Sequence, residues 1–165
     1  MQAEYYTIDC HLPGGLSIMP HPRGGEWLAD EMHSLRAAGV DVLVSLLTRD
    51  EIWDCNLADE AQQCMSAGMD FRSFSIPDRS VPPADISTFD FIDQLADLVA
   101  QGKHVAIHCW AGIGRSSTLA ACVMIHHGYT PNEALTLLRR ARGREVPDTA
   151  AQTEWIAAFA QRREG

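Results

Sequence analysis

A nine-residue stretch at positions 108–116, His-Cys-Trp-Ala-Gly-Ile-Gly-Arg-Ser, constrains the fold of this chain more than any other feature. The segment Val105–Ile107 before it is apolar and β-prone, and Ser116–Ile125 after it has the composition of a buried helix. The stretch therefore links a strand to the start of a helix. At that point unpaired backbone N–H groups and the positive end of the helix dipole favour an anion.

The composition of this loop indicates that the anion is a phosphate. Gly112 and Gly114 permit positive φ angles, so several successive N–H groups can point at one centre. Arg115 can donate to two phosphate oxygens through its planar guanidinium. The same positive surroundings favour the thiolate form of Cys109 at neutral pH. Six residues are predicted to bind the phosphate: Trp110, Ala111, Gly112, Ile113, Gly114 and Arg115.

The pattern His-Cys, five residues, Arg-Ser resembles the signature of the cysteine-based protein tyrosine phosphatases, and Ala111, Gly112 and Gly114 resemble its dual-specificity branch. The resemblance extends from about residue 42 to residue 159. It implies metal-independent hydrolysis of phosphotyrosine, with phosphoserine and phosphothreonine as further candidates, through a phosphocysteine on Cys109. It also implies that Arg115 binds the phosphate, that Ser116 stabilises the departing thiolate, and that His108 braces the loop through hydrogen bonds rather than acting as a base.

Composition sets wider bounds. A chain of 165 residues, 46% of them hydrophobic, is long enough for one domain with a substantial core, so we expect a single domain over residues 1–165. The net charge of −9 gives no global basic field that would attract nucleic acid. The sequence contains no stretch of about 18 apolar residues, so membrane insertion is not predicted. The five cysteines show no metal-like pairing, which favours a reducing compartment and a cytoplasmic location.

The pattern of elements predicts the fold class. Three strands are expected, at residues 41–47, 70–76 and 103–108, with helices at residues 58–67 and about 84–100. We therefore predict an α/β domain whose small, mainly parallel sheet is flanked by helices on both faces. A strand near Tyr5–Ile8 is expected to add antiparallel pairing at an edge. Residues 13–25, rich in Pro and Gly, are predicted to form a surface loop.

The same topology selects a general acid. Right-handed crossovers join parallel strands, so Ile76 and His108 should end on one edge of the sheet, where ligands bind in open α/β folds. Asp78 follows the first of these strands, in a predicted acid loop at residues 77–82. A carboxylic acid there can protonate the leaving oxygen, an effect worth about 10²–10⁴-fold. Pro77-Asp78 also resembles the acid loop of the family.

Three further side chains receive a predicted role. Gln152, near the start of a late helix, is the candidate to orient the hydrolytic water, with an ordinary solvated glutamine as the alternative. Glu51 is expected either to support Arg115 or to act as a charge at a helix N-terminus. The Trp110 ring should point away from the inward amides and pack against the core, with a pocket wall as the alternative.

Two other segments are interpreted first as having structural roles. Thr130-Pro131-Asn132-Glu133 is a capping box that opens a helix running to about residue 141. The arginines at positions 139, 140, 142 and 144 close that helix, with the steering of an anionic substrate as a second reading.

The chemistry requires no cofactor and no metal ion, and the expected partner is a phosphorylated protein or peptide. A monomer is the default expectation. Three alternatives remain open at this point: a phosphate-binding protein of the same fold without hydrolysis, a sulfurtransferase carrying a persulfide on Cys109, and an arsenate reductase.

Overall fold

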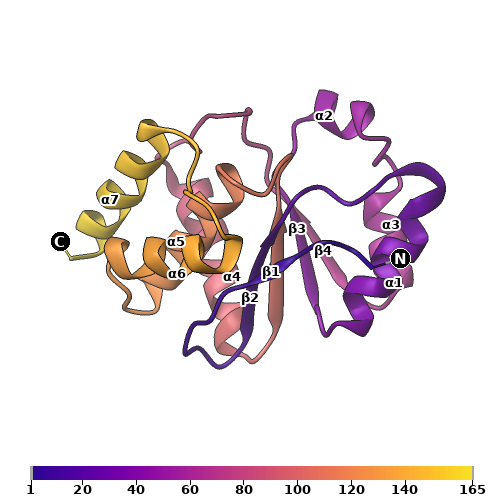
Figure 1. The fold of residues 1–165 in the computed structure, drawn as a ribbon. Helices are drawn as coiled ribbons and strands as arrows, with labels where there is room; N and C mark the ends of the chain where they lie inside the picture. The colour runs from indigo at the N-terminus through magenta and orange to yellow at the C-terminus, as the bar shows by residue number, and fades with distance from the viewer. Residues whose placement is uncertain (1, 165) are drawn as a thin grey trace.

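The centre of the molecule is a sheet whose strands follow the order β1-β2-β5-β3-β4 in the computed structural model, which describes residues 2–164 (Figure 1). β1 pairs with β2 antiparallel, and the other neighbours pair in parallel. The mainly parallel α/β fold is therefore confirmed, and so is the antiparallel strand near the N-terminus. The strand bounds are Tyr6–Thr7 (β1), Gly15–Met19 (β2), Val42–Ser45 (β3), Asp70–Ser73 (β4) and His104–His108 (β5).

Helices cover both faces of this sheet. In Figure 1, α1 and α3 lie on one side of it, and α4, α5, α6 and α7 lie on the other. No helix in the described part of the chain is long and apolar enough to cross a membrane. The bounds are Gly25–Trp27 (η1, a 3₁₀ turn), Leu28–Ala37 (α1), Arg49–Asp54 (α2), Glu60–Ser66 (α3), Ile86–Ala100 (α4), Arg115–His126 (α5), Pro131–Arg142 (α6) and Ala150–Glu164 (α7).

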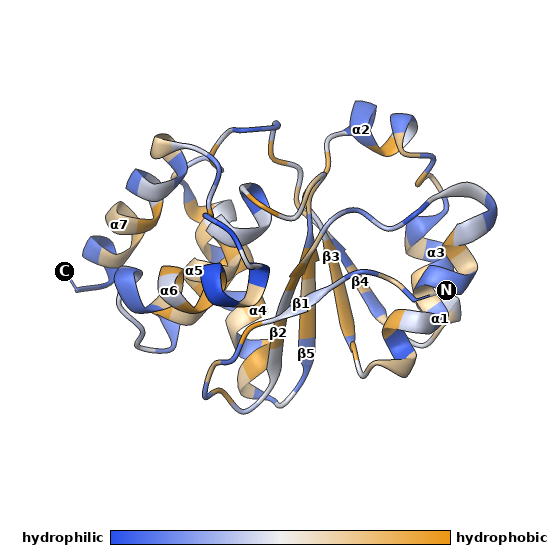
Figure 2. Ribbon diagram, viewed as in Figure 1, coloured by the Kyte–Doolittle hydropathy of each residue, from blue (hydrophilic) through white to orange (hydrophobic). Residues whose placement is uncertain are grey.

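Alternation along the strands divides the apolar core into two layers. Val105 and Ile107 of β5 pack into the cluster shared with α4 to α7, whereas Ala106 between them packs into the cluster shared with α1 and α3. Successive strand residues point to opposite faces, and here both faces are buried. The strands accordingly appear as a largely hydrophobic centre between helices of mixed hydropathy (Figure 2).

The prediction that residues 13–25 form a surface loop is wrong, because Gly15–Met19 is β2 and pairs with the central strand β5. Leu16 and Ile18 are fully buried. The strand is short and carries a serine in its middle, which hid its apolar pattern. Ser17 is tolerated in the core because its hydroxyl lies 3.0 Å from Thr7 Oγ1 and 2.6 Å from His104 Nε2.

The parallel arrangement places the site. The carboxyl ends of β2, β3, β4 and β5 meet at one edge of the sheet, so the segments that follow them converge there. The predicted convergence of the segments after Ile76 and His108 is thus confirmed. The predicted capping box at Thr130 is also present, with Glu133 N–H donating to Thr130 Oγ1 and Glu133 Oε1 accepting from Thr130 N.

Candidate active site

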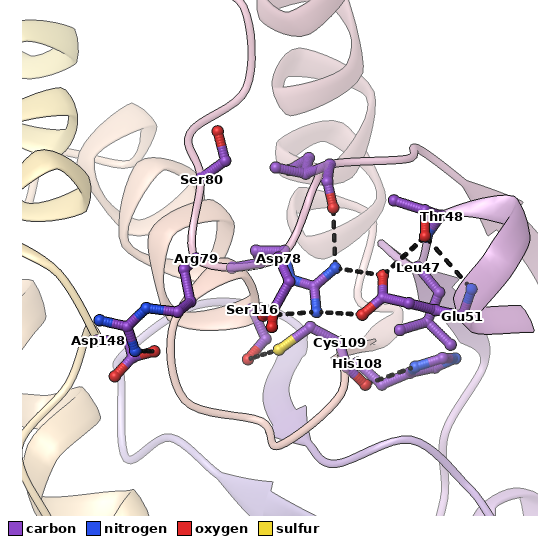
Figure 3. A network of polar contacts seen from close by, with 12 residues as sticks. Leu47, Thr48, Glu51, Asp78, Arg79, Ser80, His108, Cys109, Ser116 and Asp148 are labelled. Atoms are coloured by element: carbon purple, nitrogen blue, oxygen red, sulfur yellow. Dashed lines mark hydrogen bonds and ion pairs between the residues drawn. The ribbon is translucent and has the colours of Figure 1, made fainter. Parts of the chain in front are cut away.

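The loop at residues 108–116 connects β5 to α5 and forms the floor of a cavity of about 160 Å³. A larger hollow, of about 730 Å³ beside α1, contains none of the predicted site residues. The polar network around the loop is drawn in Figure 3. The lining of the small cavity combines residues from three separate segments: Asp78, Arg79, Cys109, Trp110, Ala111, Ile113, Gly114, Arg115, Asp148 and Gln152.

Cys109 lies at the bottom of this cavity. The residue is only 2% exposed, and its Sγ is 3.3 Å from Ser116 Oγ (Figure 3). Once the thiol has lost its proton, the Ser116 hydroxyl is the partner that can donate. Ser116 also belongs to the first turn of α5, where the helix dipole favours a negative charge. The geometry thus favours a negative charge on Cys109 Sγ, both when the sulfur acts as a nucleophile and when it acts as a leaving group.

The guanidinium of Arg115 is held rigidly beside Cys109. Its Nη1 and Nη2 donate to the two carboxylate oxygens of Glu51 at 2.7 and 2.8 Å, and Nη1 also donates to Ile76 O at 2.8 Å. Burial disfavours the charged form of Arg115, yet the pKa is raised because the Glu51 hydrogen bond and the negative charges of Cys109, Glu51 and Asp78 outweigh desolvation. Arg115 is therefore a fixed cation at the cavity.

Glu51 fills both of the roles considered for it. It is the third residue of α2, where it completes a capping box with Thr48, and its carboxylate simultaneously pairs with Arg115. Burial raises the pKa of Glu51, but the hydrogen bonds from Arg115 and Thr48 and the charge of Arg115 outweigh it, so the net shift is downward. Glu51 therefore stays ionised and orients the arginine.

Asp78 stands above the loop on the segment that follows β4. Its side chain is 66% exposed, and its Oδ1 accepts a hydrogen bond from Arg115 Nη2 at 3.1 Å. Figure 3 shows Asp78 near Cys109, and both residues line the same cavity. Asp78 thus occupies a donor of Arg115 that an incoming phosphate would require, and the exposed loop leaves the carboxylate room to move.

Gln152 lies on α7, lines the cavity and is fully buried. Its Oε1 accepts from the backbone N–H groups of Asp148 and Thr149 at 2.9 and 3.0 Å, and its Nε2 donates to Ser80 O at 3.1 Å. A primary amide has two donors and two acceptor positions. One N–H thus has no partner among the described residues and remains for a water. The alternative of a solvated glutamine is wrong, because the side chain is buried.

Arg79, next to Asp78 on the acid loop, donates from its Nη1 to Asp148 Oδ2 at 2.8 Å. Together with the Gln152 contact to Ser80, this ion pair attaches the acid loop to the start of α7 at two points. Asp148 was not predicted. The pair spans 69 residues in sequence, and no local pattern marks it.

His108 and Trp110 flank the cysteine differently. His108 is fully buried, with Nδ1 3.2 Å from Cys109 O and Nε2 2.6 Å from Glu60 Oε2. Glu60, a buried carboxylate in the first turn of α3, was also missed by sequence reasoning. For Trp110, the prediction of core packing is wrong. The residue is 43% exposed and lines the cavity, and its ring meets the ring of His21 edge-on.

Gly112 lies where no other residue fits. Its φ is +71°, and a Cβ there would lie 2.5 Å from the carbonyl carbon of Met19 and 2.6 Å from the nitrogen of Pro20. We expect Gly112→Ala to lose at least about 1–3 kcal/mol of stability from backbone strain alone, with a further loss from the clash. Urea unfolding measures the effect. Gly39→Ala is the matched control, since Gly39 has φ +99° and open space around it. Equal losses in the two variants would contradict the proposed close packing of the loop.

Comparison with known proteins identifies the same family. Residues 18–129 match the family described as "Polymorphic toxin system, DSP-PTPase phosphatase". Cyclin-dependent kinase inhibitor 3 of Homo sapiens is 29% identical over 135 residues, and that of Rattus norvegicus is 24% identical over 131 residues. Each alignment covers 78% of this chain, which spans only 61% of the length of these relatives.

Solved structures share the fold. The crystal structure of a kinase associated phosphatase with its catalytic cysteine substituted by serine superposes with a TM-score of 0.85 at 18% identity, covering 100% of this chain and 98% of that one. The active form of Tk-PTP superposes with a TM-score of 0.74 at 26% identity, covering 96% and 97%. With the family match extending over more than half of its residues, this chain belongs to the DSP-PTPase phosphatases, the dual-specificity branch of the cysteine-based protein tyrosine phosphatases.

Proposed function

We propose that this protein is a metal-independent phosphomonoesterase that acts on phosphorylated proteins or peptides through a phosphocysteine on Cys109. The observation that carries the proposal is the position of Cys109 Sγ, 3.3 Å from a helix-terminal hydroxyl and beside an arginine fixed by Glu51. Nucleophile, oxyanion partner and leaving-group acid all line one small cavity.

In the first step, the Cys109 thiolate attacks phosphorus while the bond between phosphorus and the leaving oxygen breaks. Asp78 transfers its proton to that oxygen, so the leaving group departs as an alcohol or a phenol. Arg115 and the loop amides stabilise the charge on the three equatorial oxygens.

In the second step, water attacks phosphorus and gives a proton to Asp78, while the P–S bond breaks and its electrons return to sulfur. Ser116 donates to the released thiolate. We assign the orientation of this water to the remaining N–H of Gln152, and the support of Arg115 and of the loop to Glu51 and His108 respectively.

The range of substrates follows from the height of the cavity walls. Asp78 and Trp110 are both substantially exposed and line a cavity of only about 160 Å³, which supports a shallow site. Such a site admits the short aliphatic phosphoesters as well as phosphotyrosine, and we propose dual specificity. Residues 110–114 contain no lysine to receive additional phosphate groups, so inositol phosphates are expected to be poorer substrates than phosphotyrosyl peptides.

The experiment is turnover of para-nitrophenyl phosphate in excess chelator, followed by phosphotyrosyl, phosphoseryl and phosphothreonyl peptides. Phosphate release that survives chelation supports the proposal. Tight phosphopeptide binding without release would instead favour a binding protein, and positive thiosulfate or arsenate assays would favour a sulfurtransferase or an arsenate reductase. We further propose a cytoplasmic location, supported by the need of Cys109 for a reducing environment.

Asp78→Asn is expected to lower kcat for phenyl phosphate by about 10²–10⁴-fold. The loss should be much smaller for para-nitrophenyl phosphate, whose leaving group departs readily without a proton. Steady-state kinetics on both esters measure this difference. Asp90→Asn, at an exposed position on α4, is the control. Equal losses on the two esters would show that Asp78 is not the acid.

A further inference from the structure

The backbone carbonyls of the phosphate loop have partners outside the cavity. Thr118 N and Oγ1 donate to Gly114 O, and His21 N donates to Trp110 O at 3.1 Å. The two carbonyls in the middle of the loop share one partner, Arg142. Its Nη2 donates to Ala111 O at 3.2 Å, and its Nε donates to Gly112 O at 3.1 Å.

Peptide geometry converts these outer contacts into an effect on the cavity. In a planar trans peptide the C=O of one residue and the N–H of the next point in opposite directions. A guanidinium that holds the carbonyls of Ala111 and Gly112 outward therefore turns the N–H groups of Gly112 and Ile113 the other way. Ala111 and Ile113 line the cavity, so that direction is into the cavity, where a phosphate would bind.

Arg142 is itself anchored far from the loop in sequence. It is the last residue of α6, and its guanidinium carbon lies 4.4 Å from the centre of the Tyr6 ring. Tyr6 belongs to the edge strand β1, and its hydroxyl donates to the carboxylate of Glu4. The aromatic ring attracts the cation and restricts its orientation. Three distant segments thus meet behind the phosphate loop.

We propose that Arg142 is a positioning residue for phosphate binding, that it fixes the inward orientation of the Gly112 and Ile113 amides, and that Tyr6 holds its guanidinium in place. The proposal rests on the function proposed above for the same loop. It goes beyond that function because Arg142 lies outside the cavity and touches neither the substrate nor Cys109.

The test is Arg142→Met, which keeps an unbranched side chain of similar reach but removes both donors. We expect kcat/KM for para-nitrophenyl phosphate to fall about 10-fold to 100-fold, less than the 10²–10³-fold typical of deleting a donor that contacts the oxyanion directly. The affinity for tungstate, measured by calorimetry, should fall by a similar factor. Arg140→Met, at an exposed position on the same helix turn, should change neither value.

Two additional measurements separate positioning from general stability. Millimolar guanidinium should restore part of the tungstate affinity of Arg142→Met and have no such effect on the native protein, a result that a global loss of stability would not produce. As a single substitution, Tyr6→Leu should weaken tungstate binding. Added to Arg142→Met, it should reduce the affinity little further, because the two residues act as a unit.

These measurements test the role of Arg142 independently of the proposed activity. Unchanged tungstate affinity in Arg142→Met overturns the role of Arg142, whatever the turnover. If Arg142→Met does not fold, Arg142→Lys and Tyr6→Leu decide instead, and native affinity in both overturns it. A native protein that binds tungstate but hydrolyses no phosphoester would remove the proposed activity and leave the Arg142 test valid.

Discussion

Cys109→Ser is expected to abolish turnover of para-nitrophenyl phosphate, with a loss of at least about 10⁴-fold. A serine hydroxyl is not ionised at neutral pH, and in the proposed first step Asp78 has to supply a proton to the leaving group rather than remove one from the nucleophile. The binding of tungstate should survive, because the loop amides and Arg115 remain. Acid quenching of the native enzyme during turnover, followed by mass spectrometry, should place a phosphate on the peptide that contains Cys109.

The control for this variant is Cys55→Ser. Cys55 lies at the end of α2, where burial and then the charges of Glu51, Asp54 and Glu60 raise the pKa of its thiol to about 11. That thiol is protonated at neutral pH, so its replacement should leave activity unchanged. Measurable hydrolysis by Cys109→Ser, or a phosphate adduct on another residue, would contradict the covalent mechanism.

Arg115→Lys is expected to lower kcat/KM by about 10²–10³-fold, comparable to removing an oxyanion donor. The guanidinium contacts Glu51 with two nitrogens and also reaches Ile76 O and Asp78. A lysine ammonium concentrates its donors on one atom and cannot hold Glu51 while it binds two phosphate oxygens. Kinetics with para-nitrophenyl phosphate and calorimetry with tungstate measure the two consequences.

Arg72→Lys tests the same chemical change at a partly exposed position, where Arg72 pairs with Asp70, and it should leave both measurements unchanged. Glu51→Gln is a further test of the pairing, because it preserves shape but removes the charge that orients Arg115. It should weaken tungstate binding while Cys109 and the loop remain intact. Native tungstate affinity in Arg115→Lys would show that the arginine does not hold the phosphate.

Local patterns in the sequence predicted the parts of the site that one segment encodes. The loop at residues 108–116 carries its own strand end, glycines and helix start, so its place between a strand and a helix could be predicted from local sequence alone. Asp78 could be found as well, because a general rule about parallel strands places the segment after Ile76 at the same edge. The capping box at Thr130 was equally local.

What the sequence did not indicate depends on packing between distant segments. Glu60 contacts His108 and Asp148 contacts Arg79, across 48 and 69 residues respectively. Arg142 appeared only as one cation among several at the end of a helix, and its contact with two loop carbonyls follows from how α6 packs against β1. The strand β2 was missed because the hydroxyl of Ser17 finds its partners only once Thr7 and His104 are in place.

β4 lies at an edge of the sheet, where a strand from a second copy of this chain could pair with it. β4 pairs with β3 on one side and with no strand on the other among the described residues, so a row of backbone groups is left at that margin. The strand is only four residues long and carries the charged pair Asp70 and Arg72. Short, charged margins are poor templates for edge-to-edge aggregation. We therefore expect that β4 does not extend the sheet by pairing with a strand of another copy of this chain.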